Sequence, residues 1–190
     1  MVQQIRGFEQ LSDAQREAAA AVLKSALRHA PAAWRNLSAA RAEVDSFFEE
    51  PDRAAIALIE NEALIGWAGR ISRYDGNAWE LHPLVVSPTH QRQGCGRRLM
   101  AALEDLARSA GVSTIFLGAD DDFAGTSLFG HDLYPDPLVW ASRIEPTGDH
   151  PFVFYRKVGY AVVGVLPDAN GPGKPDILMA KRVRPHTSRG

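Results

Sequence analysis

Residues 84–99 read LVVSPTHQRQGCGRRL, a β-prone run followed by a polar turn, two glycines and the start of a helix. Gly94 and Gly96 allow the backbone to approach a ligand closely and to take unusual dihedral angles. The first turn of the following helix presents unpaired N–H groups and the positive end of the helix dipole. This order therefore predicts a site for a pyrophosphate, with positive charge added by Arg92, Arg97 and Arg98.

Turn residues and apolar periodicity predict the elements before this loop. Ser12 and Gln15 have the spacing of a capping box and open an alanine-rich helix to about Arg28. A second amphipathic helix follows at 38–50. Two strands at 54–59 and 63–71 form a hairpin that turns at residues 61–62, and a third strand covers 79–86. Pro83 cannot donate to a ladder, so it marks an edge, a bulge or a break in pairing.

The elements after the loop complete an α/β pattern. We expect a helix at 96–110, a strand at 114–117 and a long irregular stretch at 120–149. A short helix after His150 should cover 151–159, and the two last strands 160–166 and 177–183. Leu99, Leu103 and Leu106 should form the apolar face of the first of these helices. This order predicts an α/β fold around a mostly antiparallel sheet.

Composition limits the class of protein. The 190 residues predict one domain over 1–183 and a short basic tail at 184–190. A formal net charge of -2 argues against a nucleic-acid partner. Cys95 is the only cysteine, which rules out an internal disulfide and suits a reducing cytosol. With no signal-peptide core, no run near the roughly 20 apolar residues of a membrane span, and scattered histidines, we expect a cytoplasmic protein without a metal site.

Two motifs carry a resemblance to a known family. The pattern Gln91-x-x-Gly94-x-Gly96 after a strand resembles the acetyl-CoA loop of the GNAT superfamily of N-acyltransferases, and its spacing differs from nucleotide-binding fingerprints. FYRKVGY at 154–160 resembles the late F-Y-x-K-x-G-F/Y helix of the same superfamily. The resemblance covers about residues 54–182. It implies a mostly antiparallel mixed sheet flanked by helices, with parallel strands at 84–86 and 114–117 splayed apart at the acetyl-CoA site.

The resemblance implies acetyl-CoA as co-substrate and direct attack of an amine on the thioester. A main-chain N–H at 84–86 would polarise the thioester carbonyl. The residues expected to bind the co-substrate are Leu84, Val85, Val86, Gln91, Arg92, Gln93, Gly94, Cys95, Gly96, Arg97, Arg98 and Tyr155. Cys95 is interpreted as a small spacer beside the pyrophosphate, because no histidine stands in a recognisable frame to make it a nucleophile.

Acid and base candidates come from the motifs and their surroundings. Tyr155, from the Phe-Tyr pair, is the candidate general acid for the departing thiolate, the alternative being a packed aromatic. Glu80 and Asp120 are candidate bases, and each could instead bind substrate ammonium groups. His82 could also serve, although a lone strand histidine is commonly a structural hydrogen-bonding residue.

The charge distribution and several short sequence segments suggest which amine accepts the acetyl group. Residues 120–176 hold nine acidic side chains against four Lys or Arg, which suits a polycationic ligand or a merely solvated loop. ELHPLVV at 80–86, HPF at 150–152, PDANG at 167–171 and KPDI at 174–177 resemble aminoglycoside 6'-N-acetyltransferases. That likeness implies acetylation of a drug's 6'-amine, with Glu80, Asp120 and Asp121 facing the drug. Trp34 and Trp67 would wall the pocket or pack in the core.

Other readings of the same fold stay open. A polyamine, a peptide N-terminus or a lysine would also present an amine, and fold alone does not choose between them. A domain that binds acetyl-CoA without turnover is a further alternative, which Tyr155 and Glu80 argue against. Homodimerisation is common in such enzymes, but no feature of this sequence demonstrates it.

Overall fold

The computed structural model describes residues 3–26, 34 and 36–185. The described residues form two compact units, the first within 3–113 together with 183–185 and the second Thr114–Arg182. The end of the first predicted helix, at residues 27–28, and most of the predicted tail lie outside the described residues.

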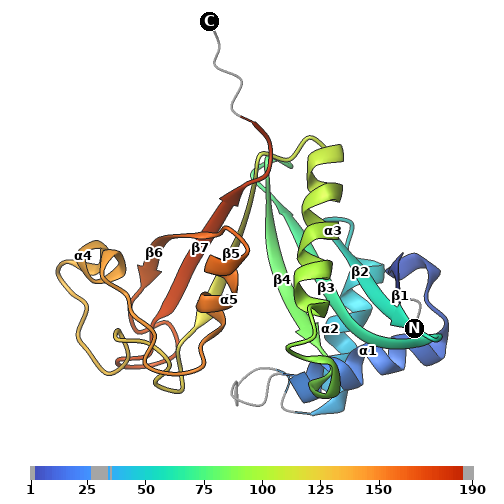
Figure 1. Ribbon diagram of the computed structural model, residues 1–190, viewed down its shortest axis with the longest axis horizontal. Coiled ribbons are helices and arrows are strands. Elements are labelled where there is room, and N and C mark those ends of the chain that lie inside the picture. Colours follow the sequence, from blue (N-terminus) through green and yellow to red (C-terminus); the bar gives the residue numbers. More distant parts are fainter. Residues whose placement is uncertain (1–2, 27–33, 35, 186–190) are drawn as a thin grey trace, which may run out of the picture. The chain divides into compact units, whose positions relative to one another are not determined.

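Four antiparallel strands form the sheet of the first unit (Figure 1): β1 (Gln3–Gly7), β2 (Arg53–Glu60), β3 (Ala63–Arg73) and β4 (Ala78–Val86). The predicted hairpin is confirmed, since Asn61 and Glu62 both have positive φ, 48° and 64°, as a two-residue hairpin turn requires. β1 was not predicted, because Ile5 is its one large apolar residue and the pattern gives no alternation.

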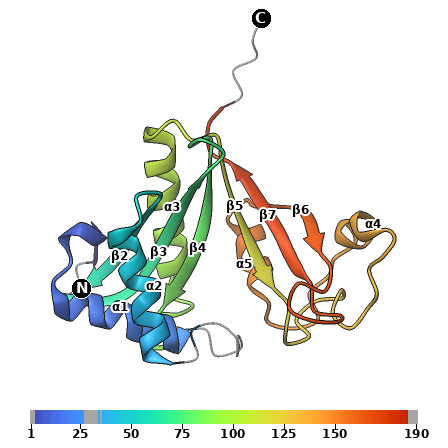
Figure 2. The same cartoon turned by 180° about the vertical axis from the view of Figure 1, so that it is seen from behind.

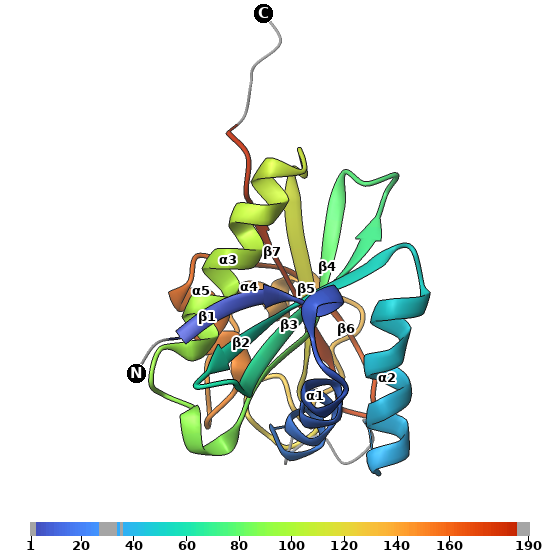
Figure 3. The ribbon, with the colours of Figure 1, turned by 90° about the vertical axis from the view of Figure 1, so that its right-hand side faces the viewer.

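Three α-helices cover this sheet: α1 (Asp13–Ala26), α2 (Leu37–Glu49) and α3 (Cys95–Ser109), with 3-10 turns η1 (Phe8–Gln10) and η2 (Pro88–His90). α3 stands in front of the strands in Figure 1, whereas α1 and α2 come to the front in Figure 2. Figure 3 likewise separates α3 from α1 and α2, so the two groups cover opposite faces.

The predicted capping box opens α1. Gln15 N–H donates to Ser12 Oγ at 3.3 Å, and Ser12 N–H donates to Gln15 Oε1 at 3.1 Å. Two N–H groups at the start of the helix thus gain partners reciprocally.

The core between α1, α2 and the sheet is aromatic. Trp67 is fully buried against Phe8 and Phe47, and its indole N–H donates to Ala19 O at 3.1 Å. Trp67 is therefore a core residue, which decides between the two readings given from sequence. On the other face, α3 buries Leu99, Met100 and Leu103, while Leu106 is 47% exposed, so the predicted apolar face is wrong at that one position.

A bulge interrupts β4 at the predicted place. The pairing with β3 goes from Ala68 opposite Leu84 to Arg70 opposite Leu81, so His82 and Pro83 stand out of register. Pro83 has no N–H to lose, which is why this break suits it. The prediction for Pro83 is confirmed, and the bulge sets the direction in which the His82 side chain projects from β4.

The second unit holds β5 (Thr114–Asp120), β6 (Ala161–Leu166) and β7 (Asp176–Arg182), with β7 paired antiparallel to both others. Two short helices, α4 (Pro137–Ser142) and α5 (Pro151–Lys157), accompany them. α4 lies in the stretch predicted to be irregular. The α/β class with a mostly antiparallel sheet is confirmed. None of the helices in the described ranges is long and apolar enough to cross a membrane.

Candidate active site

The glycine loop connects β4 to α3 through a left-handed residue. Gly94 is the N-cap of α3 with φ 87°, a conformation that favours glycine. A Cβ there would have no atom of the described chain within 4 Å, so the space beside the backbone is open. The first N–H groups of a helix have no acceptor inside it. The open backbone and these N–H groups fit a pyrophosphate.

Glutamine side chains fold the loop. Gln91 Nε2 donates to Val86 O at 3.0 Å, and Gln93 Nε2 donates to Thr89 O at 2.8 Å. The first of these bonds explains why the motif begins with glutamine, because it ties the loop to the end of β4. Gln91 and Gln93 thus shape the loop through their side chains.

Two further predicted co-substrate residues are engaged with β1. Arg98 donates to Gln3 O at 2.7 Å and to Gln3 Oε1 at 3.0 Å. Cys95 is buried, with Gln3 Nε2 at 4.0 Å from its sulfur. A buried thiol facing an amide is consistent with the spacer role. The structure points the Arg98 guanidinium at β1, so its role toward phosphate stays a prediction.

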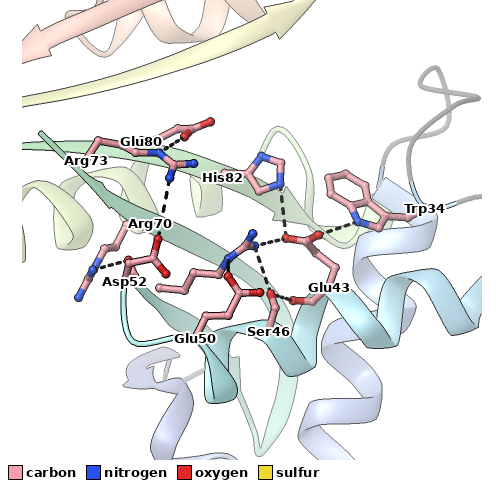
Figure 4. Close-up of polar contacts among 10 residues, drawn as sticks. Trp34, Glu43, Ser46, Glu50, Asp52, Arg70, Arg73, Glu80 and His82 are labelled. Carbon is pink, nitrogen blue, oxygen red and sulfur yellow. Dashed lines mark hydrogen bonds and ion pairs between the residues drawn. The ribbon is translucent and has the colours of Figure 1, made fainter.

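Glu80 of β4 forms an ion pair instead of standing alone. Arg73 Nε donates to Glu80 Oε2 at 2.9 Å, and Arg73 Nη1 lies 3.8 Å from Asp52 Oδ2 (Figure 4). The Glu80 side chain is 28% exposed. The sequence did not indicate Arg73 as a partner.

His82 and Trp34 meet at one carboxylate, Glu43 of α2 (Figure 4). His82 Nε2 lies 3.4 Å from Glu43 Oε1, and Trp34 Nε1 donates to Glu43 Oε2 at 3.3 Å. Arg53 Nη1 also donates to Glu43 Oε1, at 2.9 Å. The sequence missed Glu43 and Arg53, since neither belongs to a motif.

Burial raises the pKa of Glu43, but other contributions outweigh it. The hydrogen bond from His82 and its charge when the ring is protonated, the hydrogen bond from Trp34 and the charge of Arg53 together leave that pKa below its ordinary value. Glu43 is therefore ionised at neutral pH and can accept from all three donors.

Asp120 ends β5 with an exposed carboxylate. Asn170 Nδ2 donates to Asp120 Oδ1 at 2.6 Å. Asp176 of β7 is its register partner, and the missing Cβ of Gly118 makes room for the Asp176 carboxylate. Two carboxylates thus stand on neighbouring strands at one end of this sheet, an arrangement that attracts a cation.

Asp121 has a different environment from its neighbour. It is fully buried, and it accepts from Gly125 N–H at 2.8 Å, Thr126 N–H at 2.8 Å and Thr126 Oγ1 at 2.7 Å. Both oxygens are used inside the loop. The expectation that Asp121 faces the substrate conflicts with this burial, and the geometry makes it the anchor of residues 121–126.

His150 joins the loop, β5 and α5. Its Nε2 lies 3.0 Å from Asp120 O, and its Nδ1 accepts from Phe152 N–H at 3.2 Å as the N-cap of α5. A ring that accepts at Nδ1 and faces a carbonyl with Nε2 is neutral with its proton on Nε2. Burial lowers the pKa of His150, and the nearby aspartates oppose this only in part.

Tyr155 lies on α5 in the second unit. Its ring packs edge-on against Phe154 and Tyr160, at centroid distances of 5.2 and 5.9 Å. Burial raises the pKa of the Tyr155 phenol. The hydroxyl therefore holds its proton throughout the physiological pH range, as a general acid must before it acts.

The glycine cradle and the Phe-Tyr helix define the class, an acetyl-CoA-dependent N-acetyltransferase. The model of the acetyltransferase (GNAT) family matches residues 19–133, more than half of the chain and parts of both units. The chain belongs to the GNAT family, and the predicted GNAT fold, with its mixed sheet flanked by helices, is confirmed. Acetyl-CoA is the co-substrate.

Three known acetyltransferases are similar to this chain. The crystal structure of an aminoglycoside 6'-N-acetyltransferase complexed with coenzyme A has a TM-score of 0.88 and 35% identity, over 99% of this chain and all of that one. An aminoglycoside 6'-N-acetyltransferase from Enterococcus faecium gives 0.86, 35% and the same coverage. N-alpha-acetyltransferase RimI of Mycobacterium tuberculosis is 40% identical over 63 residues, which span 32% of this chain and 39% of RimI.

Proposed function

We propose that this enzyme is an aminoglycoside 6'-N-acetyltransferase that transfers acetyl from acetyl-CoA directly to the primary 6'-amine. The supporting observation is similarity to such an enzyme over 99% of this chain and 100% of the other, with 35% identity and a TM-score of 0.88. Likeness over the whole length includes the regions outside the co-substrate loop, where acceptor specificity arises.

The charges in both units suit such an acceptor. Asp120 presents an exposed carboxylate at the end of β5, with Asp176 opposite it on β7, and Glu80 pairs with Arg73 while its side chain stays 28% exposed. An aminoglycoside carries several ammonium groups, and each of these carboxylates, within its own unit, would attract one of them. His82 and Trp34 would contribute a polar and an apolar surface.

The proposed reaction is a direct displacement. A main-chain N–H of residues 84–86 polarises the thioester carbonyl, and the acceptor amine loses a proton to Glu80, His82 or Asp120. The N–C bond forms, the C–S bond breaks, and Tyr155 protonates the departing thiolate. Because the product amide is neutral, the drug loses a charge that it needs to bind ribosomal RNA. The role would be antibiotic resistance in the cytoplasm.

The partial match to RimI favours a second candidate, acetylation of a protein N-terminus. A peptide substrate requires an open groove, whereas the long segment 120–149 contributes many residues beside the acidic end of β5. The shorter extent of the RimI match makes this candidate the weaker one.

Thiol release from acetyl-CoA tests the proposal. Kanamycin and tobramycin should be turned over, and spermidine, a lysine peptide and a peptide with a free N-terminus should not. The matched control is an aminoglycoside that carries a hydroxyl in place of the 6'-amine, which should release no thiol. Turnover of that control, or of the peptides alone, would refute the 6'-amine assignment while leaving the acetyltransferase class intact.

A further inference from the structure

A single carboxylate, Glu43, collects three donors from three other parts of the first unit. Trp34 precedes α2, Arg53 begins β2, and His82 stands at the bulge of β4. The Glu43 side chain is 18% exposed, and it has two oxygens to satisfy all three donors. A surface ion pair formed for solubility alone would not need such an enclosed geometry.

Arg53 makes the carboxylate rigid. Besides Glu43, its guanidinium donates to Ser46 Oγ at 3.1 Å and to Glu50 Oε2 at 2.8 Å. Both ends of the Arg53 guanidinium are therefore hydrogen-bonded to side chains of α2 or of its C-cap residue, Glu50. Glu43 is fixed by its own helix and by Arg53 before any substrate arrives.

This arrangement sets the orientation of the His82 ring. To donate to Glu43, Nε2 must carry a proton, and in the neutral ring Nδ1 is then the acceptor. Nδ1 lies on the side of the ring turned away from Glu43 (Figure 4). The His82 side chain is 38% exposed, about twice as much as Glu43. The accepting nitrogen is thus on the more open side of the pair.

We infer that Glu43 is a positioning residue that fixes His82 as the proton acceptor for the incoming amine, with Nδ1 outward and Nε2–H held inward. The inference rests on the proposed function, because it takes the acceptor amine to meet β4. In the transfer step, Nδ1 takes one proton from the attacking nitrogen as the N–C bond forms. The C–S electrons leave with the thiolate, which Tyr155 protonates, so charge and protons balance.

The other charged groups around His82 are already neutralised. Arg53 from β2 is shared by Glu43 and Glu50, and Glu80 on the same strand as His82 is paired with Arg73 from β3, beside Asp52. Glu43 is therefore the charged group that contacts the imidazole directly.

The test is the substitution Glu43→Gln with two readouts. An amide accepts on one side only, so its NH₂ must face a donor, either Trp34 or the pair of His82 and Arg53. In the free enzyme, ¹⁵N NMR should find the His82 proton on Nε2 in the wild type and spread over both ring nitrogens in the variant. With kanamycin, kcat should fall about tenfold or more, with an unchanged KM for acetyl-CoA.

Two further proteins make the test specific. Glu50→Gln removes the other carboxylate on Arg53 without touching His82, and it should keep the wild-type tautomer and rate. If Glu43 acts through His82, the double variant Glu43→Gln/His82→Asn should be no slower than His82→Asn alone.

The outcomes separate the inference from the proposed function. An unchanged His82 tautomer in Glu43→Gln, or additive losses in the double variant, would overturn the positioning role. If the wild type turns over no aminoglycoside, the proposed function fails, and the NMR comparison still decides whether Glu43 orients His82.

Discussion

Gly69 of β3 lies against the carbonyl oxygen of His82 on β4, so closely that a Cβ on Gly69 would overlap that oxygen and the ring of Phe47. The two residues meet at the bulge where β4 leaves register with β3. At the same bulge, the His82 ring lies with Nε2 3.4 Å from Glu43 Oε1. Glycine is thus required at position 69 because no Cβ fits there, and not because φ is positive.

Gly69→Ala should therefore cost about 1–3 kcal/mol of unfolding free energy, as overpacking typically does. The added methyl group must displace backbone, so turnover should fall together with stability. Urea unfolding and steady-state rates measure both. Gly164→Ala is the matched control, since its Cβ would meet only Leu178 Cδ1 at 3.8 Å. Equal stability of the two variants would contradict the close packing at the bulge.

Asp121→Asn should destabilise the second unit. The carboxylate receives three donors on its two oxygens, and an amide would face at least one of them with its NH₂. Losing a buried hydrogen bond to a charged group costs about 1.5–3 kcal/mol. Thermal unfolding compared with Asp136→Asn, an exposed aspartate that makes no side-chain cap bond, measures the loss. A direct substrate role would instead spare stability and lower drug affinity.

The sequence predicted the elements whose signals are local. The capping box at Ser12, the turn at residues 61–62 and the break at Pro83 each follow from a few neighbouring residues, and all three are present. The glycine loop was recognisable because its backbone demands particular residues. β1 and α4 were missed, because β1 has one large apolar residue and α4 has only six residues, too few for a helical period to show.

Side-chain partners were harder to predict than elements. Glu43 and His82 are far apart in sequence, and no spacing rule connects a helix position to a strand position. Asp120 and Asp121 are adjacent with the same chemistry, yet Asp120 ends β5 and is exposed, whereas Asp121 begins the loop and is buried by it. Their difference becomes visible only when the loop that surrounds Asp121 is known.

His150 should make stability fall on acidification. Its pKa is lowered in the folded state, so between that value and the unfolded value of about 6.5 the unfolded chain binds the extra proton. Stability then rises with pH in this window and is fully present above about pH 6.5. Melting temperatures between pH 5 and 8 should show a steeper fall below 6.5 for the wild type than for His150→Asn. Parallel curves would mean that His150 does not carry the effect.

Asp120→Asn should weaken aminoglycoside binding by about fivefold, the value of an exposed ion pair of about 1 kcal/mol, with little change for acetyl-CoA. The new amide oxygen can still accept from Asn170, so the fold is kept. Calorimetry with each ligand measures the two affinities. Asp132→Asn, in the same acidic segment, is the control for general charge. An equal loss of acetyl-CoA affinity would mean that Asp120 does not face the acceptor.

Tyr155→Phe should lower kcat by about a hundredfold and leave drug affinity nearly unchanged, because only the proton donor is lost. Burial raises the pKa of Tyr155 above its ordinary value of about 10, so the wild-type rate should show no loss from phenol ionisation below that pH. The pH–rate profile of the variant should therefore keep the wild-type shape at a lower level. Tyr134→Phe makes the same change at a side chain that is 58% exposed, and it should turn over normally. If Tyr155→Phe matches Tyr134→Phe in kcat, the hydroxyl of Tyr155 is not the acid, and the thiolate takes its proton from another donor.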